Sequence, residues 1–232
     1  GLTPRLEGRP AMAEMKLGFF GVNAGVVAAP ASMARVAQVA EAAGFESLWT
    51  GEHVVAASPR VPPSPVRPDT HFVDQVAALA HLAAHTTTLR LGTGIVILPQ
   101  RNPVVLAKEL ASIDVLSGGR LEAGFGVGYV PAEFDAVGVP FSERGARMDD
   151  HIDALRAMWR GDLEFEGPFT SWHGVEAHPR PVGPDGPPIH VGGGSPATFR
   201  RAVLRADGWY GFFSTLASTR SPIEAMDRGV AD

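Results

Sequence analysis

Short apolar runs and longer segments with helical periodicity alternate along most of this 232-residue chain. The runs are rich in β-branched and aromatic residues and hold few charges, which is typical of strands buried on both faces. We therefore predict six strands. Their ranges are Met15–Val22, Phe45–Thr50, Leu89–Leu98, Arg120–Phe125, Ile189–Val191 and Gly208–Phe213.

The segments between the strands place apolar residues three and four positions apart, which predicts amphipathic helices. Their ranges are Ala31–Ala43, Phe72–His85, Val104–Leu116, Glu143–Trp159 and Pro196–Ala206, with a last short helix starting near Ser221. Because strands and helices alternate strictly, we expect a parallel sheet with right-handed crossovers.

Two segments fall outside this alternation. Residues 1–14 mix Arg, Pro and Glu without an apolar run, and we interpret them as an N-terminal extension or a cloning remnant. Residues 161–188 are rich in Gly, Pro and His and are predicted to be an insertion with one hairpin. Residues 15–232 would then form a single α/β domain that contains this insertion.

An open doubly wound sheet and a TIM-type (β/α) barrel both fit this order of elements. Eight strands close a barrel, so six strands alone slightly favour the open sheet. However, an open sheet binds its ligand where two strands diverge, whereas polar or Gly-rich residues mark at least four strands here, which favours the barrel. These segments are Thr50–His53, Gly92–Gly94, Gly126–Tyr129 and Gly192–Ser195.

Composition narrows the classes of partner. The formal net charge is −5 and no basic stripe is visible, which argues against a nucleic-acid partner. The chain has no cysteine, which excludes disulfides and thiolate metal sites and fits a cytoplasmic protein. No segment reaches the roughly 18 consecutive apolar residues that a membrane span needs, so we expect no membrane partner.

Few side chains are candidates for chemistry on position alone. His53 directly follows a strand and could exchange protons near neutral pH, although a surface histidine is an equal alternative. Gly193, Gly194 and Ser195 precede a helix and could bind a phosphate, or they could form a plain turn with a serine cap. A dinucleotide-binding loop is disfavoured because Tyr129 stands where its third glycine belongs.

Three other features provide weaker evidence for a function. His81 and His85 have metal-ligand spacing, but they lack a His-Glu-x-x-His pattern or further ligands, so we predict no metal. Ala197 replaces the last glycine of a serine-hydrolase elbow, which disfavours a serine hydrolase. Arg120 opens a strand, and its position does not decide between a structural and a site role.

These residues together resemble the luciferase-like monooxygenase superfamily. The main match is LGTGIVILPQRNPVVLAKELASIDVLSGGRLEAGFGVGYVPAEFDAVGVPFSERGARMDDHIDALRAMW, residues 91–159. FESLWTGEH at 45–53 and IHVGGGSPATFRRAVLRADGWY at 189–210 extend it in the family's order. The subgroup it resembles most uses the deazaflavin coenzyme F-420, which implies an oxidoreductase with its ring at the carboxyl-terminal mouth of a barrel.

The resemblance also implies roles for individual residues. A non-prolyl cis peptide behind the ring corresponds to Gly94–Ile95, and Glu52 and His53 correspond to the acidic residue and histidine near the reactive edge. The remaining counterparts are Gly126, Gly128 and Tyr129 in the loop over the cofactor, Gly193, Gly194 and Ser195 at the phosphate, and Arg120, which reaches the phosphate in some flavin-using relatives.

Two departures modify these expectations. Tyr129 stands where some deazaflavin dehydrogenases have a catalytic glutamate, which argues against sugar-phosphate dehydrogenation. The family's last two strands are not found, so the barrel is expected to be incomplete in this chain. We predict hydride transfer between a small organic substrate and F-420, in a homodimer as is frequent in the family. The alternatives are an FMN-dependent monooxygenase with a partner reductase, a shortened and catalytically silent barrel that binds flavin or self-associates, and, less favoured, an NAD-binding open sheet.

Overall fold

The computed structural model describes residues 15–62, 64, 66–212 and 214–229, so the predicted extension at 1–14 lies outside the described residues. Six parallel strands follow one another across the sheet in chain order, which confirms the predicted topology. They are β1 (Gly18–Phe20), β2 (Ser47–Thr50), β3 (Arg90–Thr93), β5 (Leu121–Gly126), β8 (Ile189–Gly192) and β9 (Gly208–Tyr210).

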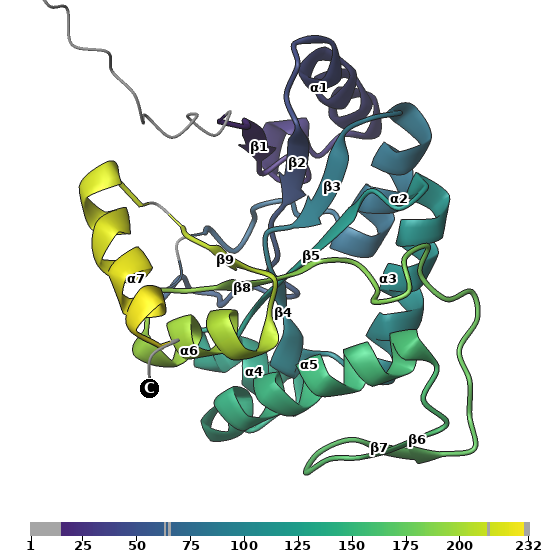
Figure 1. Ribbon diagram of the computed structural model, residues 1–232. Helices are drawn as coiled ribbons and strands as arrows, with labels where there is room; N and C mark the ends of the chain where they lie inside the picture. Colours follow the sequence, from purple (N-terminus) through teal and green to yellow (C-terminus); the bar gives the residue numbers. More distant parts are fainter. Residues whose placement is uncertain (1–14, 63, 65, 213, 230–232) are drawn as a thin grey trace, which may run out of the picture.

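The helices lie along the outer side of a curled sheet (Figure 1), and successive helices contact one another. They are α1 (Pro30–Ala42), α2 (Gln75–His85), α3 (Pro103–Ser117), α5 (Arg144–Arg160), α6 (Pro196–Arg205) and α7 (Leu216–Gly229). Within the described residues β1 and β9 each pair on one side only, so the architecture is an incomplete TIM-type barrel.

The structure departs from the predicted elements most clearly at three places. The helix expected near Ser221 begins at Leu216, because the hydroxyl groups of Thr215 and Ser218 each accept the other residue's backbone N–H and so cap the helix start. Leu89–Leu98 is not one strand: β3 ends at Thr93, and a two-residue strand β4 (Val96–Ile97) and a 3-10 turn η2 (Leu98–Gln100) follow. A short helix, α4 (Pro131–Val137), was not predicted.

The interruption between β3 and β4 lies beside Gly124 of β5. The Thr93 hydroxyl donates to the Gly124 carbonyl (2.8 Å) and accepts from the Gly124 N–H (2.7 Å), which takes the place of strand pairing there. The Gly94–Ile95 peptide that follows is cis, as the resemblance implies. β4 then pairs with the carboxyl end of β5.

The two faces of the sheet differ in character. The outer face packs Leu48, Leu91, Leu121, Phe125 and Ile189 against the helices, and each is fully buried. The inner face carries the alternate residues, which include Trp49, Gly92, Glu122, Gly124, His190 and Tyr210. The core therefore lies between sheet and helices, whereas the inner face is polar, aromatic and rich in glycine.

The predicted insertion contains an antiparallel hairpin, β6 (Glu164–Glu166) with β7 (Ser171–His173), as expected. Phe165 stacks on Trp172 with ring centroids 4.8 Å apart. Among the residues that the structure describes, no helix combines the length and the hydropathy needed to cross a membrane.

Glu41 of α1 ties the helix to the segment that leads into β3. One of its carboxylate oxygens accepts the backbone N–H groups of Thr87 (2.8 Å), Thr88 (2.6 Å) and Leu89 (3.1 Å) and the Thr88 hydroxyl (2.9 Å). Burial alone would raise the pKa of Glu41, but these hydrogen bonds outweigh it and lower the pKa to about 2.

We expect Glu41→Gln to lower the free energy of unfolding by about 1 kcal/mol at neutral pH, since charge-assisted hydrogen bonds become neutral ones at a largely exposed site. The pKa of Glu41 is lower in the folded state than its unfolded value of 4.5, so the ionised side chain stabilises the fold above pH 4.5. This contribution is lost as the pH falls toward 2. Urea unfolding at neutral and acid pH should therefore show the difference from wild type shrinking in acid. A constant difference would contradict the charge role, and Glu46→Gln, which alters an exposed pair with Lys16, serves as control.

Candidate functional site

The carboxyl ends of β2 and β5 bring two residues together that are 80 positions apart. His53 follows β2 and Glu133 lies in the first turn of α4, and His53 Nδ1 is 2.5 Å from Glu133 Oε1. The side chains are 11% and 1% exposed. A carboxylate against Nδ1 fixes the tautomer that carries its hydrogen there, which leaves Nε2 as the basic nitrogen. The second carboxylate oxygen of Glu133 is buried and has no partner among the described residues.

The chain after β5 turns sharply to place Glu133. Gly128 has φ 74°, and a side chain there would also collide with Ile97 and Phe134 at 2.7–2.8 Å. Pro131 and Glu133 occupy the first and third positions of α4, and the fully buried Phe134 anchors the helix. Sequence reasoning missed Glu133, although proline followed by an acidic residue is a known signal for a helix start.

Tyr129 lies in the same turn and is 48% exposed. Burial of the ring and the negative charge of Glu133 both raise the pKa of its hydroxyl. It therefore stays protonated at neutral pH and can donate a hydrogen bond at the mouth of the barrel.

Glu52 does not face the same side as its neighbour His53. Its carboxylate accepts the Ile97 backbone N–H (2.5 Å) and pairs with Arg101, which also reaches Asp74 (3.2 Å). Burial raises the pKa of Glu52, and the charge of Arg101 opposes that shift. Its side chain is 4% exposed, so Glu52 anchors the segment after the cis peptide, and its catalytic role stays a prediction.

Gln75, the first residue of α2, also stabilises the segment around the Gly94–Ile95 peptide. The Thr50 hydroxyl donates to Gln75 Oε1 (2.6 Å), and Gln75 Nε2 donates to the Ile95 carbonyl (3.1 Å). Both side chains are buried. Neither residue was singled out from the sequence, because a buried Gln at a helix start has no distinctive local pattern.

Inner-face glycines let neighbouring side chains pack closely around the Gly94–Ile95 peptide. A Cβ atom at Gly94 would lie 2.7 Å from the Tyr210 hydroxyl, and one at Gly126 would lie 2.5 Å from Ile95 Cδ1. Tyr210 packs against Trp49 with ring centroids 5.0 Å apart, and burial raises the pKa of Tyr210 to about 12. The glycines thus admit the Ile95 and Tyr210 side chains, which fill the space beside Gly126 and Gly94.

Gly193, Gly194 and Ser195 lie on the surface at the start of α6, at the same edge of the sheet. The Ser195 hydroxyl accepts the Thr198 N–H (3.2 Å), so it caps the helix. A Cβ atom at Gly194 would meet nothing within 4 Å, so this turn is open to an approaching group. Both sequence interpretations, a serine cap and an anion site, are compatible with this geometry.

Arg120 lies at the opposite edge, which corrects its assignment to the cofactor site. Its guanidinium donates to the carbonyl groups of Leu89 (2.8 Å), Ser117 (2.6 Å) and Thr86 (3.1 Å). These bonds tie the helix ends below β3 and β5 together. Because the residue precedes β5, its side chain cannot share a site with groups that follow the strands.

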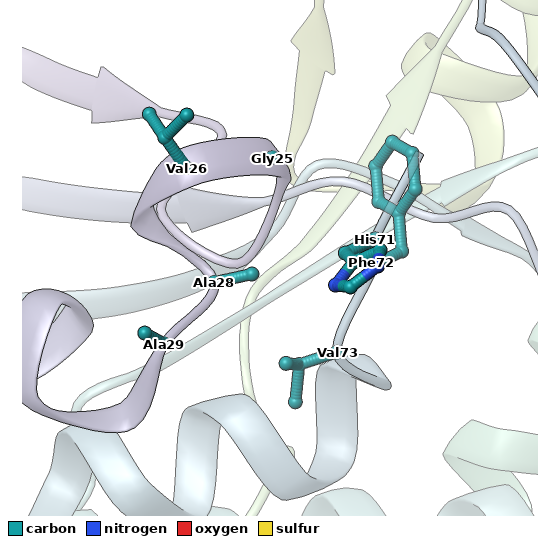
Figure 2. A pocket seen from close by; sticks show the side chains of 7 residues that line it. All are labelled: Gly25, Val26, Ala28, Ala29, His71, Phe72 and Val73. Atoms are coloured by element: carbon teal, nitrogen blue, oxygen red, sulfur yellow. The ribbon is translucent and has the colours of Figure 1, made fainter. Parts of the chain in front are cut away.

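A shallow hollow lies beside this site (Figure 2), between the 3-10 turn η1 (Gly25–Val27) and the segment before α2. Phe72 lines this hollow and also contacts His53, and the two rings are 5.5 Å apart. Its lining is mostly apolar: Gly25, Val26, Ala28, Ala29, His71, Phe72 and Val73. Over the described part of the chain, no three His, Asp or Glu side chains are grouped to hold a metal ion.

Comparison with known proteins provides independent evidence on the family of this chain. A sequence model of the family described as luciferase-like monooxygenase matches residues 15–232. The oxygenase component of flavin-dependent trigonelline monooxygenase from Acinetobacter baylyi is 33% identical over 74% of this chain and 45% of its own length. F420-dependent glucose-6-phosphate dehydrogenase from Kineococcus radiotolerans is 32% identical over 78% of this chain and 52% of its own.

Among solved structures, the monooxygenase RslO1 from Streptomyces bottropensis superposes with a TM-score of 0.76 at 27% identity. The match covers 94% of this chain and 66% of that one. The chain spans 45–66% of the length of the relatives and structures that it matches.

Proposed function

Because the chain belongs to the luciferase-like monooxygenase family, we propose that it transfers a hydride between a small organic substrate and the deazaflavin coenzyme F-420. Relatives include both F-420-dependent and flavin-dependent enzymes, so an oxidoreductase is the common activity. The observation that carries the proposal is the His53–Glu133 pair beside the Gly94–Ile95 peptide, at the edge where such barrels hold their active sites.

The residues fit a cofactor of this shape. A flat ring would lie against the Gly94–Ile95 peptide, with Gly126, Gly128 and Tyr129 in the loop above it. The open turn at Gly193–Ser195 would take its phosphate at the start of α6. The buried second oxygen of Glu133, which has no partner among the described residues, would accept a hydrogen bond from a water molecule next to His53.

The bound deazaflavin would supply the hydride acceptor or donor, and the chain supplies position and proton handling. His53 Nε2 would take the proton that a substrate hydroxyl releases, or return it to a carbonyl in the reverse direction. Glu133 would hold the imidazole in one orientation and balance its positive charge once it is protonated. Glu52, Gln75 and Thr50 would keep the Gly94–Ile95 peptide in place.

An FMN-dependent monooxygenase that works with a partner reductase is the second candidate. Tyr129 favours this candidate, because it stands where some deazaflavin dehydrogenases have a catalytic glutamate. The trigonelline monooxygenase relative is also flavin-dependent. A homodimer and a cytoplasmic location are further proposals, supported by the family resemblance and by the composition without cysteine.

Titration of the purified protein with F-420 and, separately, with FMN tests the proposal. We expect a saturable change in cofactor absorbance and fluorescence with micromolar affinity for F-420. Tighter binding of FMN, together with oxygen consumption when reduced FMN is supplied, would favour the monooxygenase. Binding of neither cofactor would contradict both, and binding without turnover on any substrate would favour a catalytically silent barrel.

A further inference from the structure

We propose that the hydroxyl group of Tyr210 donates a hydrogen bond to the ring of the bound cofactor, which adds a residue of β9 to the cofactor site. This inference rests on the proposed function and names a further residue of the same site. It follows from the place of the hydroxyl group beside the Gly94–Ile95 peptide, from the packing that fixes it there, and from its need for an acceptor.

Tyr210 reaches across the inner face of the sheet. It is the last residue of β9, whereas Gly94 follows β3, and β5 and β8 lie between these two strands. A Cβ atom at Gly94 would nevertheless lie 2.7 Å from the Tyr210 hydroxyl oxygen and 3.0 Å from the ring carbon that carries it. The side chain therefore points into the curled sheet and not away from its edge, so its position does not depend on what adjoins β9.

Packing on both sides fixes the hydroxyl group in this position. The Tyr210 ring packs against Trp49 with centroids 5.0 Å apart. Trp49 in turn lies over Gly92, where an added Cβ atom would overlap the indole ring. The Gly94 N–H donates to the Thr50 carbonyl (2.8 Å), which holds the backbone beside the hydroxyl group. The donor is thus in place before a ligand arrives, which lowers the entropic cost of binding.

The Tyr210 hydroxyl group is a donor without an acceptor. Burial raises the pKa of Tyr210 to about 12, so the group keeps its proton at neutral pH. Among the described residues, no backbone or side-chain atom forms a hydrogen bond with it. A hydroxyl group that is withdrawn from water without a partner destabilises its surroundings. An acceptor atom of a ligand beside Gly94 would restore the missing hydrogen bond.

The other side chain beside this peptide is apolar. A Cβ atom at Gly126 would lie 2.5 Å from Ile95 Cδ1, and one at Gly192 would lie 3.1 Å from Ile95 Cγ2. Ile95 therefore extends over the carboxyl ends of β5 and β8, where it offers dispersion contacts and no hydrogen bond. Tyr210 is then the side chain at Gly94 that can distinguish a polar ring from an apolar one.

An apolar surface with one fixed donor suits a flat heteroaromatic ring that carries carbonyl groups at its edge. The rings of F-420 and FMN both have such carbonyl groups, whereas an apolar aromatic ring would leave the Tyr210 hydroxyl unpaired. The hydroxyl group of Tyr210 would therefore contribute to the affinity for either cofactor by about one net hydrogen bond.

Tyr210→Phe tests the proposal, because it removes the hydroxyl group and keeps the ring against Trp49. Fluorescence titration should show about 3- to 10-fold weaker binding of F-420, or of FMN if the wild-type protein prefers FMN. Thermal unfolding of the cofactor-free variant should match wild type. Ser112→Ala is the matched control, because its hydroxyl group donates to the Lys108 carbonyl (2.7 Å) on the outer helix α3.

Carbon-13 NMR gives a readout independent of affinity. The chain has two tyrosines, so labelling at Cζ yields two signals, and Tyr210→Phe identifies that of Tyr210, which should shift when the cofactor is added. Unchanged affinity in Tyr210→Phe, an equal loss in Ser112→Ala, or a loss accompanied by a destabilised cofactor-free protein would overturn the role of Tyr210 and leave the proposed function intact. Failure of the wild-type protein to bind either cofactor would overturn both.

Discussion

Replacing His53 by asparagine is expected to lower turnover by about 10²- to 10⁴-fold while cofactor affinity changes little. The asparagine amide can still donate to Glu133 from near the position of Nδ1, so the local structure is kept. What is lost is the basic Nε2 nitrogen, and with it the group that takes up or returns the substrate proton. Steady-state kinetics with F-420 and a substrate alcohol or ketone measure the effect.

Glu133→Gln separates the role of the carboxylate from that of the imidazole. A neutral amide no longer fixes the Nδ1-protonated tautomer and no longer balances an imidazolium, so we expect a smaller loss of about 10- to 100-fold and an altered pH–rate profile. His81→Asn is the control, because this ring lies on α2 and bonds the Pro30 carbonyl (3.0 Å) away from the site. Full activity in His53→Asn, or equal losses in all three variants, would remove the pair from the mechanism.

Gly124→Ala is expected to lower the free energy of unfolding by about 3 kcal/mol or more, which is far above the effect of a typical point mutation. An added Cβ atom would overlap the backbone oxygen of Thr93. That oxygen cannot move aside, because the Thr93 hydroxyl is itself bonded to both backbone groups of Gly124 (2.7 and 2.8 Å). The strands β3 and β5 would have to separate at the point where the site is built.

Urea unfolding of the variant provides the measurement. Gly194→Ala is the matched control, since a methyl group there meets nothing within 4 Å, and its stability should stay within about 0.5 kcal/mol of wild type. A loss of less than 1 kcal/mol in Gly124→Ala would show that the two strands can separate cheaply. The tight β3–β5 contact would then not be what shapes the Gly94–Ile95 segment.

Much of the fold follows from local sequence pattern, because a strand covered on both faces must be apolar throughout and a helix covered on one face must repeat. This explains why the order of strands and helices around the sheet was predicted correctly. The same reasoning failed at Leu89–Leu98, where the hydrophobic pattern is continuous. The break after Thr93 depends on a hydroxyl contact with Gly124 on another strand, which no local pattern records.

The site was predictable only in part, for the same reason. His53 was singled out because it directly follows a strand, but its partner Glu133 lies 80 residues away in a helix that is too short to show a period. Arg120 was misplaced because a resemblance transfers a role without the direction of the side chain. Glu52 was placed near the right segment, yet its burial against Ile97 and Arg101 makes it an anchor.

Amide hydrogen exchange with and without saturating F-420 tests most directly whether these strand ends form the cofactor site. Slower exchange is expected at the segments that surround the Gly94–Ile95 peptide and at the start of α6, with no change at the amino-terminal edge of the sheet around Arg120. The protected segments should be 51–55, 93–98, 126–131 and 192–196. Protection confined to residues 25–29 and 71–73, around the hollow beside the site, or to 117–121, would contradict the account.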